Sequence, residues 1–195
     1  MWQSETDYRT IHSHDTSRQQ VYFVDKDNDD DGTSRQPSAR ESYLKLFKNL
    51  TKDALTINSM TLDVGQGRRI FVPMASEELD IARFTFCQLC STAKGAADYL
   101  ATGDRFHTVF VDDVPKLKFN EVNLVRRWIT FIDSMYECHV RLIILAKTEP
   151  EEMFEVDLDS QYDEVFAFDR TRSRMEEMRS DVYLKKHHHE LLSSA

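Results

Sequence analysis

Three arginines near the end of the chain are the side chains best suited to binding phosphate. Arg170, Arg172 and Arg174 occupy alternate positions, and Glu176 and Glu177 follow directly. A guanidinium group can hold phosphate oxygens through two parallel hydrogen bonds, and it can equally pair with a carboxylate of its own chain. Charged helix faces commonly serve solvation and local pairing, which favours the second interpretation and leaves the first open.

A second pair of arginines, Arg126 and Arg127, lies on the polar face of a predicted helix. Further polar residues follow on that face within three turns, namely Thr130, Asp133, Ser134 and Glu137. Residues three or four positions apart on a helix are neighbours, so this face predicts a ladder of side-chain pairs. The alternative is that one arginine reaches a nucleotide or a neighbouring subunit, as arginine fingers do.

Two carboxylates, Asp112 and Asp113, follow the apolar run Phe106–Val111. This pattern is similar to the strand whose acids hold magnesium in P-loop ATPases. The chain contains no GxxxxGK[ST] phosphate loop, however, so these acids have no bound phosphate to act on. The glycines of Val64–Arg69 precede a strand rather than a helix, which predicts a turn and not a phosphate cradle. We therefore expect Asp112 and Asp113 to be strand-end or capping carboxylates.

An acidic stretch, Asp27–Gly32, opens with the DxDxDG pattern of a calcium-binding loop. Such a loop needs a bidentate acid at its twelfth position, and Ser38 stands there. A solvated insertion is the favoured interpretation. His187–His189 is interpreted as part of a frayed tail rather than as a metal site.

The cysteines offer an incomplete set of zinc ligands. Cys87 and Cys90 form a CxxC pair, while Cys138 and His139 lie elsewhere and adjacent to each other. Zinc sites of this type normally contain a second spaced pair, and adjacent ligands struggle to point at one ion. We therefore predict buried thiols rather than zinc or redox chemistry, and no metal-binding residue in the chain.

The elements that must position these residues alternate between strands and helices. Apolar runs predict strands at Gln20–Val24, Leu55–Val64, Arg68–Pro73, Ala82–Phe86, Phe106–Val111, Val140–Ala146 and Val165–Phe168. Apolar residues at helical spacing predict helices at Ala39–Thr51, Ala93–Ala101 and Glu121–Glu137, and a last helix after Phe168 with a capping box of Ser173 and Glu176. The predicted class is α/β, with a β-hairpin and a β-α-β crossover in a mixed sheet packed by helices.

Composition narrows the class of protein. The chain has 195 residues, a formal net charge of −9 and 41% hydrophobic residues, which suits one globular domain or slightly more. The negative charge disfavours a nucleic-acid surface, and no apolar run approaches the ~18 residues of a membrane-spanning helix. The N-terminus is neither a secretory signal nor an Arg-rich transit peptide. Three unevenly spaced cysteines indicate a reducing compartment.

Four segments are expected along the chain. Residues 1–24 form the start of the chain with its first short strand, and residues 25–38 form an acidic disordered insertion. The α/β domain occupies residues 39–184, and residues 185–195 form the frayed tail.

Several separate blocks in the same order resemble one known family. The segment FAFDRTRSRMEEMRSDVYL is similar to the RTxSRLxEMxSxxY ending of the AAA+-related ATPases (the ATPase-family-gene-one-like ATPases) that include the mitochondrial lactation-elevated protein and the bacterial cell-division ATPase ZapE. FTFCQLC, AADYLATGDRFHTVFVDDVPKL and VRRWITFIDSMYECHVRLIILA resemble further blocks, and QSETDYR resembles the family's DYR block. The departures are small: Trp128 replaces a phenylalanine, Met175 replaces a leucine, and Cys87 has no counterpart.

The resemblance implies the C-terminal portion of a P-loop-type ATPase. In that family the phosphate loop, the magnesium-binding strand and the sensor strand precede the DYR block, with which this sequence opens. Met1 is therefore expected to be an internal start. The intact family protein uses ATP and magnesium and acts on other proteins, in mitochondria on inner-membrane subunits and in bacteria on the division machinery.

Several expectations about the chain follow from this resemblance. On its own we expect it to bind no ATP, to need the missing N-terminal half or neighbouring subunits, and to reside in the mitochondrion or in a bacterial cytoplasm. The alternative is a non-catalytic protein-interaction module that binds through an exposed sheet edge.

Four arginines are the candidate site residues under this resemblance. Arg127 and Arg174 are the candidates for a catalytic role, in which they reach nucleotide or a neighbouring subunit. Arg126 and Arg170 are the candidates for cofactor contact.

Overall fold

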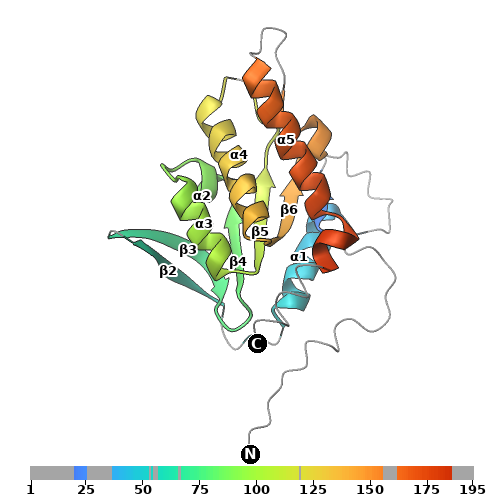
Figure 1. The fold of residues 1–195 in the computed structure, drawn as a ribbon. Helices are drawn as coiled ribbons and strands as arrows, with labels where there is room; N and C mark the ends of the chain where they lie inside the picture. The colour runs from blue at the N-terminus through green and yellow to red at the C-terminus, as the bar shows by residue number, and fades with distance from the viewer. Residues whose placement is uncertain are drawn as a thin grey trace, which may run out of the picture.

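The computed structural model describes residues 20–25, 37–52, 54, 57–65, 67–118, 120–155 and 162–185. They form one six-stranded sheet in the order β1-β6-β5-β4-β3-β2, with helices on both faces (Figure 1). The predicted α/β class and the mixed sheet packed by helices are confirmed. The DYR block, residues 26–36 and the histidines at 187–189 lie outside the described residues.

Four parallel strands make up the centre of the sheet and one of its edges. They are β1 (Tyr22–Val24), β6 (Arg141–Ala146), β5 (Thr108–Val114) and β4 (Ile81–Thr85). The helix α4 (Val122–Glu137) connects β5 to β6, which confirms the predicted β-α-β crossover. All but one of the residues of β5 are buried, as expected for a parallel strand covered on both faces.

An antiparallel hairpin extends the sheet on its other side. Its strands are β2 (Asn58–Gly65) and β3 (Arg68–Ser76). Gly65 and Gly67 adopt φ values of 88° and 76°, which residues with a side chain rarely tolerate. The strands on either side of these glycines pair as the predicted hairpin.

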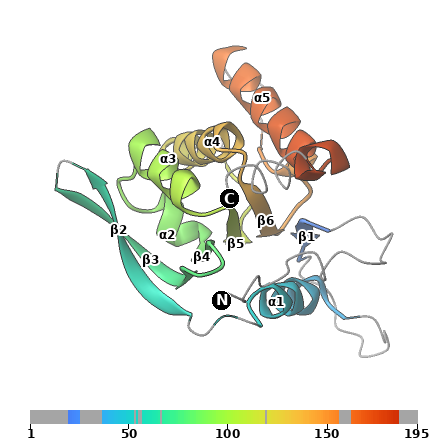
Figure 2. The same ribbon diagram turned by 60° about the horizontal axis from the view of Figure 1, so that its bottom comes forward.

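Helices cover the two faces of the sheet unequally (Figure 2). On one face, α1 (Ala39–Leu50) places Tyr43 and Phe47 edge-on against Phe110, with ring centroids 5.4 and 5.0 Å apart. The other face carries α2 (Phe86–Cys90), α3 (Ala96–Arg105), α4 and α5 (Tyr162–Met178). A short 3-10 helix, η2 (Pro150–Glu152), precedes α5.

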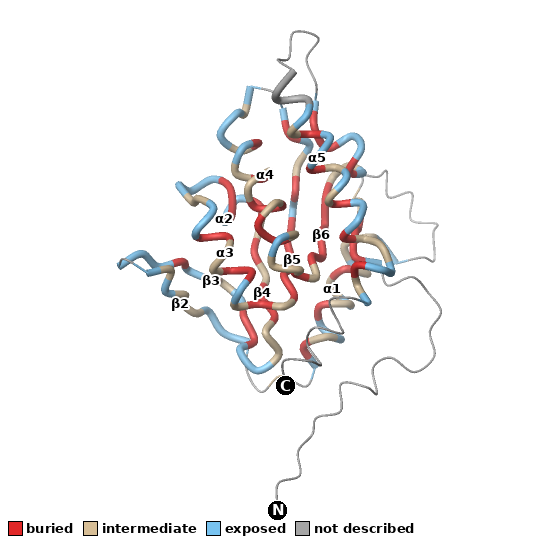
Figure 3. The backbone as a smooth tube through the Cα atoms, in the orientation of Figure 1, coloured by how far each residue is buried: buried red, intermediate tan, exposed pale blue. Residues whose placement is uncertain are grey.

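The larger core lies between the sheet and the four helices on that second face. Its centre is Trp128, which is fully buried and stacks on Phe131 at 5.4 Å. Burial is continuous along β4, β5 and β6 and falls away along β2 (Figure 3). The buried parallel strands therefore fix the positions from which side chains at their ends extend.

The predicted strand Val165–Phe168 is wrong, because these residues lie inside α5. Valine and phenylalanine favour strands locally, but the buried residues Phe168, Thr171, Met175 and Met178 recur every three or four positions. This spacing belongs to one helix face, and Phe168 stacks on Phe154 at 4.5 Å. Ser173 is consequently an interior helix residue, so the predicted capping box with Glu176 is also wrong.

Capping boxes do begin two other helices. Ser38 and Glu41 exchange side-chain and backbone hydrogen bonds at the start of α1, and Thr85 and Gln88 do so at the start of α2. The latter places the CxxC pair in a short helix that the sequence reading missed. The helix predicted at Ala93–Ala101 begins later, with Gly95 as its N-cap, and continues to Arg105.

Candidate functional site

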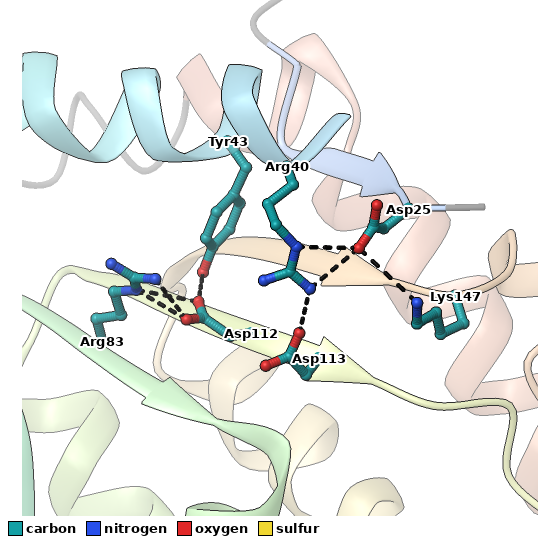
Figure 4. A network of polar contacts seen from close by, with 7 residues as sticks. All are labelled: Asp25, Arg40, Tyr43, Arg83, Asp112, Asp113 and Lys147. Carbon is teal, nitrogen blue, oxygen red and sulfur yellow. Dashed lines mark hydrogen bonds and ion pairs between the residues drawn. The ribbon is translucent and has the colours of Figure 1, made fainter. Parts of the chain in front are cut away.

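The carboxyl ends of the parallel strands are the place where this type of sheet binds ligands. After β6 the chain passes to η2 and α5 on one face, whereas the next described element after β1 is α1 on the opposite face. Neighbouring parallel strands whose continuations leave in opposite directions define a topological switch point, and open α/β sheets bind ligands in the crevice there. Charged side chains lie near the end of β5 and directly after β6 and β1 at this point (Figure 4).

One half of this polar site is a buried carboxylate held by an arginine and a tyrosine. Arg83 Nε lies 3.0 Å and Arg83 Nη2 2.6 Å from Asp112 Oδ2. The hydroxyl of Tyr43 donates to Asp112 Oδ1. The Asp112 and Arg83 side chains are only 10% and 17% exposed, so the pair is shielded from water. The arginine also lies over the ring of Phe47, 5.1 Å from its centroid.

The sheet register explains why these groups meet. Asp112 is paired in β5 with Thr85 of β4, so Arg83 stands diagonally across from it on the same face. Tyr43 reaches that face from the buried side of α1. Burial, helped by the charge of Asp112, raises the pKa of Tyr43 well above its usual value. Burial acts to lower the pKa of Arg83, but its bonds to Asp112 outweigh that effect and the pKa is raised.

The other half joins α1 to the ends of β1, β5 and β6. Arg40 Nη2 donates to Asp113 Oδ1 at 2.5 Å and to Asp25 Oδ2 at 3.0 Å, and Lys147 Nζ lies 3.9 Å from the same oxygen of Asp25. Asp113 has a φ of 57° and sits in a bulge where β5 loses register with β6. The bonds to Asp113 chiefly raise the pKa of Arg40.

The combined site is electrically balanced. Its three cations and three carboxylates are Arg40, Arg83, Lys147, Asp25, Asp112 and Asp113. Every carboxylate already accepts from a cation, so the arrangement clamps α1 onto the strand ends. The prediction that Asp112 and Asp113 are strand-end carboxylates agrees with this geometry. The sequence reading missed their partners, although an arginine at alternate spacing in the apolar strand IARFT was a usable signal.

The tail arginines pair with acids of their own chain, as the favoured interpretation predicted. Arg170 Nη2 lies 2.9 Å from Asp133 Oδ2, and Arg174 forms an ion pair with the other oxygen of Asp133. Arg172 pairs with Asp169 at 3.1 Å within α5. Two candidate arginines therefore join α5 to α4 through one carboxylate.

The arginines of α4 have different surroundings. Arg127 Nη1 donates to the carbonyl oxygen of Cys90 at 2.8 Å and so ties α4 to the end of α2. Arg126 is exposed and forms no ion pair within the part of the chain that the structure describes. The predicted ladder along α4 is wrong, because Asp133 turns to α5 and Ser134 is buried and donates to Thr130 O.

The thiols do not converge. Cys90 is buried, and burial raises its pKa to about 12, while burial and Asp104 raise the pKa of Cys138 to about 11. Cys87 is exposed and Cys138 is half-buried, so the expectation of buried thiols is correct for Cys90 alone among the three. Among the described residues, no group of three or more His, Cys, Asp or Glu side chains is placed to hold a metal ion.

The fold defines the class: a mixed α/β sheet packed by helices, consistent with a P-loop ATPase-like fold. The family model of the AFG1-like ATPases matches residues 3–187, almost the whole sequence. The chain therefore belongs to the AFG1-like ATPase family.

Named relatives agree with this family. The chain is 35% identical to the cell division protein ZapE of Escherichia coli over 131 residues, which cover 67% of this chain and 33% of that protein. It is 29% identical to lactation elevated protein 1 homolog B of Danio rerio over 181 residues, which cover 77% of this chain and 35% of that protein. A Schizosaccharomyces pombe protein named as uncharacterized is 36% identical over 141 residues, which cover 60% of this chain and 31% of that protein.

The chain spans about a third of the length of these curated relatives. No solved structure matches it. Within the described residues, no helix is both long and apolar enough to cross a membrane.

Proposed function

We propose that this chain is the C-terminal α/β part of an ATP-hydrolysing protein that acts on other proteins. The observation that carries the proposal is the match of the AFG1-like family model to residues 3–187. Phosphoryl transfer needs a phosphate cradle and a positioned metal ion, and this sequence contains no GxxxxGK[ST] motif. The proposed contribution of this part is therefore packing and positioning, with ATP and magnesium held by another part of the protein.

The partners and location follow from the relatives by analogy. We propose that the protein works in bacterial cell division if its source is bacterial, and in mitochondrial protein quality control if its source is eukaryotic. ZapE is named as a cell division protein, which supports the first setting. The mitochondrial setting rests on the family resemblance alone.

Two experiments test the division of labour. Titration of the 195-residue chain with a fluorescent ATP analogue is expected to give no saturable binding. Fusion of the chain behind a P-loop segment of the family is expected to give magnesium-dependent ATP hydrolysis. Low-micromolar ATP affinity of the chain alone would contradict the proposal, and so would stop codons in the DNA directly upstream of Met1.

The candidate arginines are tested in that fusion. Arg127→Ala and Arg174→Ala are expected to lower kcat by about tenfold or more if their guanidiniums reach nucleotide or a neighbouring subunit. Arg126→Ala and Arg170→Ala are expected to raise the KM for ATP. Arg172→Ala is the comparison, as an arginine of the same helix without a candidate role; because Arg172 pairs with Asp169 and also lies over the ring of Phe154, its melting temperature is measured as well. If Arg174→Ala lowers the melting temperature as well as kcat, the loss of activity would instead be assigned to the structural link between Arg174 and Asp133.

A further inference from the structure

A groove of about 520 Å³ opens along one edge of β3, where this strand diverges from β4. Residues Arg68 to Phe71 form one wall of the groove. The other wall is formed by residues between 88 and 98, from α2, α3 and the loop between them. We call this cavity the β3 groove. It exists because β3 pairs with β4 only through Met74–Ser76. Its volume is within the ~300–1,000 Å³ of typical ligand sites.

The lining shows that the groove exposes a strand edge rather than a strand face. Arg68, Arg69, Ile70 and Phe71 are consecutive and all border it. Successive residues of a strand point to opposite faces, so a cavity bordered by both sets runs along the edge. The opposite edge of β3 is occupied by β2. Main-chain groups along the groove are thus positioned to pair with another extended segment.

The β3 groove and the Asp112 clamp involve different elements of the fold. In Figures 1 and 2 the hairpin of β2 and β3 projects from the sheet next to α2 and α3, while α1 lies over the other end of the sheet. The residues that line the β3 groove are therefore different from those of the clamp around Asp112.

Charge in the β3 groove is positive in a chain whose net charge is −9. Arg68 pairs with the buried carboxylate of Asp98, which also accepts from Gly95 N at 2.8 Å. Arg69 and Lys94 form no ion pair among the described residues. Lys94 Nζ is oriented by Thr92 Oγ1 at 2.7 Å and by a backbone carbonyl. Two cations thus remain for an acidic occupant.

An exposed aromatic ring completes the recognition surface. Phe71 is 62% exposed and lies two residues from Arg69, on the same face of β3. A segment paired with β3 would place its own alternate residues opposite these two side chains. An acidic residue fits Arg69, and an apolar residue two positions away fits Phe71.

We propose that the β3 groove binds an extended segment of a partner protein, rich in acidic and apolar residues, which adds a strand beside β3. The biological role of this binding rests on the proposed action on other proteins, whereas the binding itself does not. Binding needs no nucleotide, so its failure can be distinguished from failure of ATP hydrolysis in the fusion.

The direct test is fluorescence anisotropy with the 195-residue chain and a labelled peptide of about eight residues, Glu-Thr-Val-Thr repeated, in which a Glu and a Val stand two positions apart on one face. Two matched peptides replace Glu by Lys or Val by Pro; the second keeps the charge but cannot pair as a strand. The Glu-Val peptide is expected to bind at least about tenfold more tightly than either control. Equal binding of the Glu-Pro peptide, or of a short single-stranded oligonucleotide, would reduce the groove to a general anion surface and overturn the proposal.

Variants locate the binding. Arg69→Glu and Lys94→Glu are each expected to weaken the Glu-Val peptide by about tenfold, and Phe71→Ala by a smaller factor. Lys48→Glu, an exposed change on α1 with the same charge difference, is expected to bind normally. Thermal unfolding checks that each variant is folded. An equal loss in Lys48→Glu would overturn the proposal, as would unchanged amide exchange at residues 68–72 on peptide binding.

Discussion

At the scale of single residues, partners decide what each charged group does. Asp112 ends a strand in the way of a metal-binding acid, yet it is enclosed by Arg83 and Tyr43. Arg174 belongs to the most recognisable motif in the sequence, yet in this structure it contacts Asp133 and the ring of Tyr136, 5.0 Å from its centroid. The nature of these residues was readable from the sequence. Their interaction partners were not, because each partner lies at least about 29 residues away in the chain.

The Asp112 clamp leads to a prediction about stability. Asp112→Asn removes the charge that offsets the shielded Arg83, and such a loss costs about 3 kcal/mol. Tyr43→Phe removes one hydroxyl and is expected to cost about 1–2 kcal/mol. Urea denaturation followed by circular dichroism measures both. The clamp would be refuted as a stabilising feature if Asp112→Asn cost no more than Tyr43→Phe.

The thiols differ in exposure and therefore in expected reactivity. Cys87 is exposed, whereas Cys90 is buried with a pKa of about 12 and Cys138 has a pKa of about 11. The thiolate is the reactive form, so iodoacetamide at pH 8 is expected to label Cys87 first, the half-buried Cys138 more slowly, and Cys90 only after unfolding. Peptide mass spectrometry of time points measures the order. Early labelling of Cys90 would contradict its burial.

At the scale of elements, packing overrules local preference in two places. The run Val165–Phe168 has strand-forming residues but continues α5, because Phe168, Met175 and Met178 share one buried face. Gly103 lies within α3, where glycine alone would weaken a helix by about 1 kcal/mol relative to alanine. Glycine is nevertheless suited to this position, because α3 packs so closely on the end of α4 that a side chain would not fit.

Gly103→Ala is predicted to destabilise the protein despite the better helix propensity of alanine. An added Cβ would lie 2.8 Å from both Cβ and Sγ of Cys138, so α3 or α4 must shift. The expected cost is about 1–3 kcal/mol, typical of overpacked cores. Gly95→Ala is the comparison, because nothing lies within 4 Å of its added Cβ. Thermal unfolding measures the stability of both variants. A higher melting temperature of Gly103→Ala would contradict the close approach of α3 to Cys138.

At the scale of the whole molecule, the sheet carries two polar sites at different places. The clamp around Asp112 fixes α1 to the ends of the parallel strands, whereas the β3 groove lies where the antiparallel hairpin leaves the sheet. Burial of several tyrosines under the helices also links folding to alkaline pH. Tyr22, Tyr43 and Tyr99 all have pKa values raised mainly by burial above the usual 10.0.

Stability is therefore predicted to fall as the pH rises above about 9. Cys90 and the three tyrosines keep their protons in the folded state, while in the unfolded state they lose them near their ordinary pKa values of 9.0 and 10.0. Their contribution is fully present below those values and is lost as pH rises toward the folded pKa values. Melting temperatures from pH 7 to 11 measure the effect. Tyr43→Phe should flatten the curve, and an unchanged slope would contradict the role of Tyr43.

The sequence by itself determined the α/β class, the hairpin at GQG, the β-α-β crossover and the family blocks, because each depends on local periodicity, glycine conformation or adjacent residues. It also indicated that the tail arginines would pair with acids. Only the tertiary structure decided that Asp133 supplies that pairing, that Arg83 and Tyr43 enclose Asp112, and that β3 leaves an open edge. These outcomes depend on contacts between distant segments, whose geometry is set by sheet register and helix packing rather than by local sequence.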